Sequence, residues 1–297
     1  MNSYNSKQTS GREHASAELL QVRNLNNFVK SDLLQFASGY MIQTALTHKI
    51  TIPFCILEVS CGAMGDLKKW YSSFPAGFLD HIDGFDCSEQ CIQRAQERIL
   101  PTQKVRLTVS DASKPWPTQG VYWAVSCQMA LHYFVFNEST ARDYFQKCFD
   151  ALISGGLVVM TLPDSDTFAE RWVAKTLGND QRSNKELYQI NHVMGANDLT
   201  PTHQYWGIEY EFTLPGCVEG CLEHFIPWRE LETIAQSKGF DLVVRDNFET
   251  FARSQWNITS LSSPALLRTI YSLPHECNPK VKQVSSFYSV MIFQKKM

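Results

Sequence analysis

The most regular apolar pattern in the chain lies between residues 54 and 86. Residues 54–59 form a short apolar run of the length that a buried parallel strand needs. A turn with two glycines follows, SCGAMGD at positions 60–66, where a helix can begin. A second apolar run, residues 78–85, ends at Asp86. This order of strand, glycine turn, helix, strand and carboxylate predicts the opening unit of a doubly wound α/β fold.

Strand and helix patterns then alternate along the chain. Ser88 is a suitable N-cap for a helix that runs to about Ile99, and residues 137–153 hold the apolar face of a second helix. Repeated units of this size indicate a mostly parallel sheet with helices on both faces. We therefore predict a Rossmann-like, doubly wound α/β fold whose seven-stranded sheet includes an antiparallel closing strand, with strands at 54–59, 78–85, 105–109, 121–127, 157–162, 241–246 and 287–293.

The segment before the first strand has two parts. Residues 1–16 are rich in Ser, Asn, Gln and Gly and are expected to form a disordered N-terminal tail. Residues 19–36 have helical spacing, but Arg23 and three asparagines interrupt it. Because asparagine is costly inside a helix, this interruption predicts a bend whose side chains face a ligand.

A further irregular stretch, about 164–230, separates the fifth strand from the closing strands. We interpret it as an insertion into a single domain that spans residues 17–297. Within it, the pattern predicts a helix near 166–176 and an antiparallel strand at 205–214, and a helix at 228–238 follows at its end.

Length, composition and charge restrict the class of protein. A chain of 297 residues with 44% apolar residues can bury one large core. No apolar run approaches the roughly 18 to 20 residues of a membrane span, so we expect a soluble intracellular protein. The net charge of −3 argues against nonspecific wrapping of long nucleic acid, although recognition of one end stays open. Nine cysteines without a Cys-x-x-Cys favour neither a disulfide framework nor a metal site.

Four polar or glycine positions follow the predicted parallel strands and should lie at one edge of the sheet: Gly62, Asp86, Asp111 and Gln128. A carboxylate at Asp86 can accept both hydroxyls of a ribose, two hydrogen bonds that we expect it to gain only in the complex. The spacing fits a nucleotide-type cofactor. The plain structural alternative is a strand, turn and helix of the kind found in many α/β proteins.

Several separated motifs, taken in order, resemble those of eukaryotic and viral mRNA cap guanine-N7 methyltransferases. They are RNLNNFVKS at 23–31, SCQMALHY at 126–133, GGLVVMTLPDS at 155–165 and LEH at 222–224, the last similar to the family's Pro-Glu-Tyr. The resemblance extends from Arg23 to the final strand. It implies methyl transfer from S-adenosylmethionine (SAM) to guanine N7 of the 5′ cap, with S-adenosylhomocysteine as the other product.

The resemblance also implies the site residues. SAM would be held by Lys30, Gly62, Asp86, Asp111, Gln128 and Tyr133. Inserted elements would bind the cap through Asn26, His132, Tyr133, Glu223 and Tyr288. The chain departs from the family at the glycine turn, where Ala63 stands for a lysine and Met64 for a glycine. A cap-phosphate contact from that lysine is therefore absent, and Arg23, Lys68 and Lys69 are the candidate replacements.

The implied chemistry needs no proton transfer before attack, because guanine N7 is a neutral lone pair and the SAM methyl is bonded to a sulfonium. We therefore expect no general base and no metal, only in-line positioning of the reactants, aided by His132 and Tyr133.

Two other functions stay open at this point. The same cofactor half would serve a methyltransferase of a small metabolite, and the altered turn is compatible with an inactive cap-binding or regulatory subunit. If the chain is a capping enzyme, we expect a nuclear monomer that binds RNA at its cap and works beside other capping enzymes or an activating subunit.

Overall fold

The structure is a computed structural model, and it describes residues 17–118, 120–173, 188–194, 206–214, 218–254 and 278–297. The predicted tail, residues 1–16, lies outside the described residues. The main sheet consists of β1 (Phe54–Val59), β2 (Leu79–Asp86), β3 (Val105–Val109), β4 (Tyr122–Gln128), β5 (Leu152–Pro163), β9 (Phe240–Asn247) and β10 (Tyr288–Lys295).

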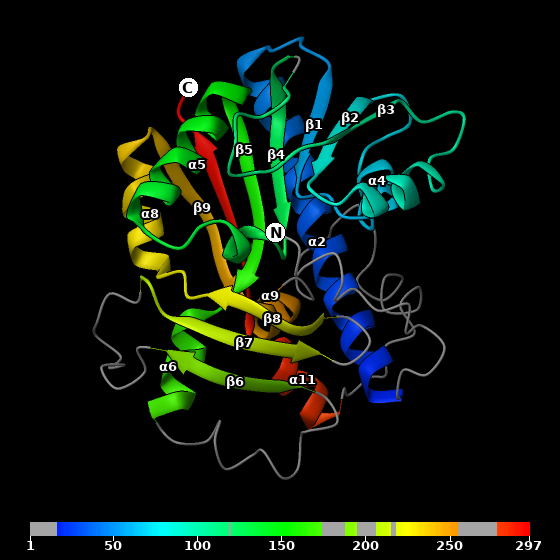
Figure 1. Ribbon diagram of the computed structural model, residues 1–297. Coiled ribbons are helices and arrows are strands. Elements are labelled where there is room, and N and C mark those ends of the chain that lie inside the picture. Colours follow the sequence, from blue (N-terminus) through cyan, green and yellow to red (C-terminus); the bar gives the residue numbers. More distant parts are fainter. Residues whose placement is uncertain (1–16, 119, 174–187, 195–205, 215–217, 255–277) are drawn as a thin grey trace.

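The strand order of this sheet is β3-β2-β1-β4-β5-β10-β9. The first five strands in that order pair in parallel, whereas β10 runs antiparallel to both of its neighbours. The predicted seven-stranded, mostly parallel sheet with an antiparallel closing strand is therefore confirmed. Figure 1 shows the parallel strands ending at one edge, toward which the arrowheads of β1, β4 and β5 point.

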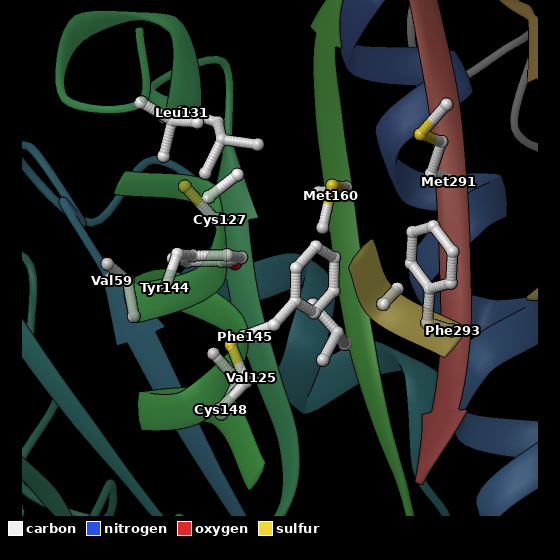
Figure 2. Packing of buried hydrophobic residues seen from close by; sticks show 14 of the residues in the cluster. Val59, Val125, Cys127, Leu131, Tyr144, Phe145, Cys148, Met160, Met291 and Phe293 are labelled. Atoms are coloured by element: carbon white, nitrogen blue, oxygen red, sulfur yellow. The ribbon is translucent and has the colours of Figure 1, made fainter. Parts of the chain in front are cut away.

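Helices cover both faces of the sheet. Every residue of β1 is therefore buried, and its alternate apolar side chains enter two different cores. One face carries α2 (Ala17–His48), α3 (Leu67–Ser73), α4 (Glu89–Gln96) and α9 (Phe248–Ser254). The other carries α5 (Glu138–Ala151) and α8 (Trp228–Ser237). Figure 2 shows Phe145 of α5 against this second face, with its ring centroid 5.4 Å from that of Phe293 on β10.

A second, three-stranded antiparallel sheet lies across the carboxyl ends of the parallel strands (Figure 1). Its strands are β6 (Gln189–Met194), β7 (Glu209–Leu214) and β8 (Val218–His224). A third core cluster joins its buried side chains to α6 (Ser165–Val173), α11 (Pro279–Ser285) and the start of α2. A short 3₁₀ turn, η1 (Leu131–Tyr133), follows β4 and contacts β8. This arrangement places the second sheet beside the edge where a doubly wound fold binds its ligand.

The helices differ from the sequence prediction in several places. The helix after Ser88, α4, ends at Gln96 instead of about Ile99, and the sequence patterns did not indicate α9 and α11. The expected interruption near Arg23 is wrong, because α2 is one continuous helix of 32 residues. Asn26 is accommodated there by a hydrogen bond from Ser285 Oγ to its Oδ1, 3.1 Å long. The second predicted helix ends at Ala151 instead of 153, since β5 already begins at Leu152.

The predicted cap of α4 is confirmed. The Cys91 N–H donates a 3.2 Å hydrogen bond to Ser88 Oγ. Within the described ranges, no helix has the length and apolarity that crossing a membrane would require.

Candidate functional site

Asp86, the last residue of β2, is tied to the glycine turn. Its Oδ2 accepts a hydrogen bond from the Gly62 N–H and its Oδ1 one from the Ser88 N–H, both 2.8 Å long. Burial raises the pKa of this carboxyl above its usual range, although the two N–H groups act in the opposite direction. Each oxygen keeps one lone pair for a ligand hydroxyl.

The turn after β1 retains a backbone suited to glycine. Gly62 has a φ of 51°, and a Cβ added there would meet nothing within 4 Å, so a ligand can approach its main chain closely. Ser60 and Met64 also have positive φ values, 53° and 52°. Arg98 donates a hydrogen bond of 2.5 Å to the carbonyl oxygen of Ala63 and so fixes the turn from the side of α4.

Two lysines share the carboxylate of Asp66, the last residue of the turn. Lys30 Nζ lies 2.8 Å from Asp66 Oδ2, and Lys69 Nζ lies 2.6 Å from Asp66 Oδ1. Burial acts to raise the pKa of Asp66, but the two ammonium groups outweigh it and hold the pKa well below its usual range. Lys69 is buried and also donates to Gly65 O, so it is a poor replacement for the missing phosphate-binding lysine. Lys68 is exposed.

Asp111 follows β3 and Gln128 is the last residue of β4, as predicted. Their side chains differ in whether a polar atom is left to bind a ligand. Asp111 Oδ1 accepts from the Ser113 N–H, while its buried Oδ2 has no hydrogen-bond partner among the described residues. The Gln128 amide donates to Ser126 Oγ and to Val159 O and accepts from Thr161. Asp111 therefore has an unsatisfied acceptor, whereas Gln128 is largely engaged by neighbouring strands.

The residues of η1 and β8 that were predicted to contact the mRNA cap meet at the carboxylate of Glu223. Glu223 is 4% exposed. Its Oε1 accepts a 3.1 Å hydrogen bond from the Tyr133 hydroxyl, and its Oε2 accepts a 2.7 Å hydrogen bond from the Tyr210 hydroxyl. His132 Nε2 lies 3.4 Å from the same Oε1. The structure thus brings together three residues that are up to 91 positions apart in the sequence, and it adds Tyr210 to them.

An aromatic pocket opens beside Glu223. Its lining includes Tyr288, the first residue of β10, together with Phe168, Tyr210, Phe225 and Phe287. The cavity volume is about 10 Å³, which is room for about one water molecule. A purine base is much larger than this volume.

Other predicted residues stand apart from this group or were missed. Asn26 of α2 is paired with Ser285 of α11, and no described contact joins it to Glu223. Tyr210 and Asp66 were not predicted as site residues. The alternation of apolar and polar residues in 205–214 could have indicated that Tyr210 faces inward. Tyr210, Phe212 and Leu214 are the buried positions of β7.

The described residues contain one trio that could hold a metal ion, Cys55, Asp80 and His81. It lies at the amino ends of β1 and β2, at the opposite edge of the sheet from Asp86. His81 is hydrogen-bonded to Asp80 and to Arg106, which satisfies the cluster without an ion. It takes no part in the site described above.

The mRNA (guanine-N(7))-methyltransferase domain is the family whose model matches this chain, over residues 1–296. The mRNA cap guanine-N(7) methyltransferase of Caenorhabditis elegans is 31% identical over 240 residues, which are 76% of this chain and 60% of the relative. The Schizosaccharomyces pombe enzyme of the same name is 22% identical over 309 residues, 99% of this chain and 81% of the relative. The chain spans 65% of the length of the Caenorhabditis briggsae relative and 60% of the Drosophila melanogaster one.

Solved structures share the fold. The plantazolicin methyltransferase BpumL in complex with SAH matches with a TM-score of 0.50 and 14% sequence identity, covering 94% of this chain and 88% of that one. At this identity the likeness concerns the fold alone.

Proposed function

This chain belongs to the mRNA (guanine-N(7))-methyltransferase family, and we propose that it transfers the methyl group of SAM to N7 of the guanine in the 5′ cap of mRNA. The observation that carries the proposal is the Glu223 cluster. A buried carboxylate, two tyrosine hydroxyls and a histidine meet beside the aromatic pocket, at the sheet edge where the cofactor of a doubly wound fold lies.

The residues at the glycine turn fit SAM. The accessible main chain at Gly62 supports close approach of the ligand, and the free lone pairs of Asp86 suit the two ribose hydroxyls. The unsatisfied Oδ2 of Asp111 suits the amino group of adenine. Lys30 would pair with the methionine carboxylate only by sharing its ammonium group with Asp66.

The Glu223 cluster suits guanine more than adenine. With N7 directed at the methyl donor, the opposite edge of guanine offers N1–H and the exocyclic amino group, which match the two oxygens of a carboxylate. Tyr288 and Tyr133 would stack on the base, which adds affinity without choosing among bases. Asn26 is assigned a more distant cap contact, which requires that it exchange its bond to Ser285.

Bound SAM supplies the electrophilic sulfonium methyl group. The chain's own contribution is to align guanine N7 with that methyl group in a site that excludes water, an effect worth roughly 7 to 11 kcal/mol when the geometry is close to ideal. His132 and Tyr133 position the base, and no residue is assigned as a general base. In this proposal residues 17–297 form a single domain that acts as a monomer in the nucleus, beside other capping enzymes.

The test is incubation of the protein with labelled SAM and GpppA, followed by analysis for N7-methylguanosine. Formation of this product supports the proposal. Methylation of small metabolites but not of GpppA would point to a metabolite enzyme. Binding of a methylated cap analogue without turnover of GpppA would point to a regulatory subunit.

A further inference from the structure

The peptide unit between His132 and Tyr133 is held from both sides. Its N–H, which belongs to Tyr133, donates a 3.0 Å hydrogen bond to Ala130 O. Its carbonyl oxygen, which belongs to His132, accepts a 2.9 Å hydrogen bond from His224 Nδ1. Because a peptide unit is planar, these two bonds fix its orientation and with it the directions of the side chains on either side.

His224 itself is anchored in the second sheet. It ends β8 and pairs across the ladder with Glu209 of β7, whose Oε1 lies 3.2 Å from His224 Nε2. The His132 carbonyl oxygen and the Glu209 carboxylate are both hydrogen-bond acceptors, so each ring nitrogen of His224 faces an acceptor. The ring of Phe136 covers it, with centroids 5.5 Å apart. His224 thus links η1 firmly to the β7–β8 ladder.

Neighbouring residues of β8 therefore hold η1 in two different ways. The side chain of Glu223 contacts the side chains of His132 and Tyr133, at 3.4 Å and 3.1 Å. The side chain of His224 is hydrogen-bonded to the main-chain carbonyl of His132.

We propose that His224 is a positioning residue for cap methylation, which fixes the His132–Tyr133 peptide so that both side chains meet the base held by Glu223. This inference rests on the proposed function. His224 does not touch the reactants in this role. Sequence reasoning gave His224 only as a departure from the family's tyrosine, whose single hydroxyl donor could not make both bonds.

The decisive experiment is a double-mutant cycle between His224→Phe and Tyr133→Phe, read as kcat/KM for GpppA. We expect His224→Phe to lower kcat/KM at least about tenfold, with SAM affinity within about twofold of the wild type. The double variant should lose little more than Tyr133→Phe alone, because the two changes act on one arrangement. If the loss of kcat/KM in the double variant equals the product of the two single losses, the proposal is overturned.

Two further variants separate positioning from general disruption. His224→Gln keeps one amide N–H for the His132 carbonyl, so it should recover part of the loss seen with phenylalanine. His48→Phe changes an exposed histidine at the carboxyl end of α2 and should leave kcat/KM unchanged. A glutamine variant as impaired as the phenylalanine variant would argue against the bond to His132.

If the wild type does not methylate GpppA, the proposed function fails and the positioning proposal is tested separately. The same cycle is then read as the free energy of unfolding in urea. Coupling between His224→Phe and Tyr133→Phe would show that His224 holds the turn, whereas additive effects would show that it does not.

Discussion

Gly62 and Asp86 are joined by a 2.8 Å hydrogen bond from the main-chain N–H of the first to Oδ2 of the second, 24 positions along the chain. The bond connects the turn after β1 to the end of β2. It gives Asp86 a structural role in the free protein besides the cofactor contact proposed for it. A substitution at Asp86 should therefore alter both stability and SAM binding.

Asp86→Asn is expected to lower SAM affinity tenfold or more and to reduce the free energy of unfolding by about 1 to 3 kcal/mol. Asparagine has one acceptor oxygen, so it cannot accept from both Gly62 and Ser88. Calorimetry of SAM binding and urea denaturation measure the two effects. Asp241→Asn, an exposed change on β9, is the matched control. Normal SAM affinity in Asp86→Asn would remove Asp86 from the cofactor site.

The fold was largely predictable because strand and helix periodicity differ and the glycine turn marks the start of the first unit. The five parallel strands and both closing strands lie close to their predicted positions. Near Arg23, tertiary packing outweighs the low helix propensity of the asparagines, so α2 continues through them. Asn26 is tolerated inside α2 because Ser285, some 259 positions away, supplies a hydrogen bond that no local pattern reveals.

The site was predictable only as a set of residue types at the ends of strands. The pairing of Lys30 with Asp66 and of Tyr210 with Glu223 depends on contacts between distant segments. A short motif indicated Glu223 in the sequence, but only the structure shows that its carboxylate is buried on β8. Spacing within one element carries no information about such contacts.

Asp32→Asn is expected to stabilise the protein at pH 8 by up to about 3 kcal/mol. Asp32 is 3% exposed on α2, and one of its oxygens has no hydrogen-bond partner among the described residues. Burial raises its pKa from 3.8 to about 6. Between pH 3.8 and about 6 the folded state keeps a proton on Asp32 that the unfolded state has released. The free energy of unfolding therefore falls as the pH rises through this range.

The measurement is urea denaturation of the wild type and Asp32→Asn at pH 4 and pH 8. The two proteins should converge at pH 4, where Asp32 is largely protonated in the folded state, and differ at pH 8. Asp150→Asn, an exposed change on α5, should show no such dependence. A difference that is equal at both pH values would mean that ionisation of Asp32 is not its cause.

Ser60→Gly and Met64→Gly should change stability in opposite directions. Both residues have positive φ values, which cost a non-glycine residue about 1 to 2 kcal/mol. Ser60 is half-buried, so its replacement should stabilise the protein by about 1 kcal/mol. Met64 is 3% exposed in the core, and loss of such a side chain typically costs about 2 to 5 kcal/mol. Met64→Gly should therefore be destabilising by about 1 to 3 kcal/mol.

Urea denaturation of both variants decides between strain and packing at the turn. A stabilising Met64→Gly would show that backbone strain outweighs the contacts that its side chain makes beside Gly84. A destabilising Ser60→Gly would show that the serine side chain contributes more than its conformation costs.

Glu223→Gln is expected to lower kcat/KM for GpppA at least tenfold and to weaken the choice of guanine. An amide offers one acceptor where guanine presents two donors, and a matched pair of bonds is worth roughly 1 to 3 kcal/mol of discrimination. The inosine cap IpppA lacks the exocyclic amino group. The wild type should therefore prefer GpppA over IpppA, and Glu223→Gln should lose most of that preference. Steady-state kinetics with both caps measure it.

Burial of Glu223 makes a control for folding essential, because its carboxylate also holds the Tyr133 and Tyr210 hydroxyls. SAM affinity reports on the intact fold, and Glu219→Gln changes an exposed carboxylate on the same strand. A general loss of structure would lower turnover of both caps equally and weaken SAM binding. Unequal losses of kcat/KM for the two caps, with normal SAM binding, would identify Glu223 as the residue that recognises the guanine edge. Near-normal kinetics in Glu223→Gln would move that role to another carboxylate of the second sheet, Glu209 or Glu211.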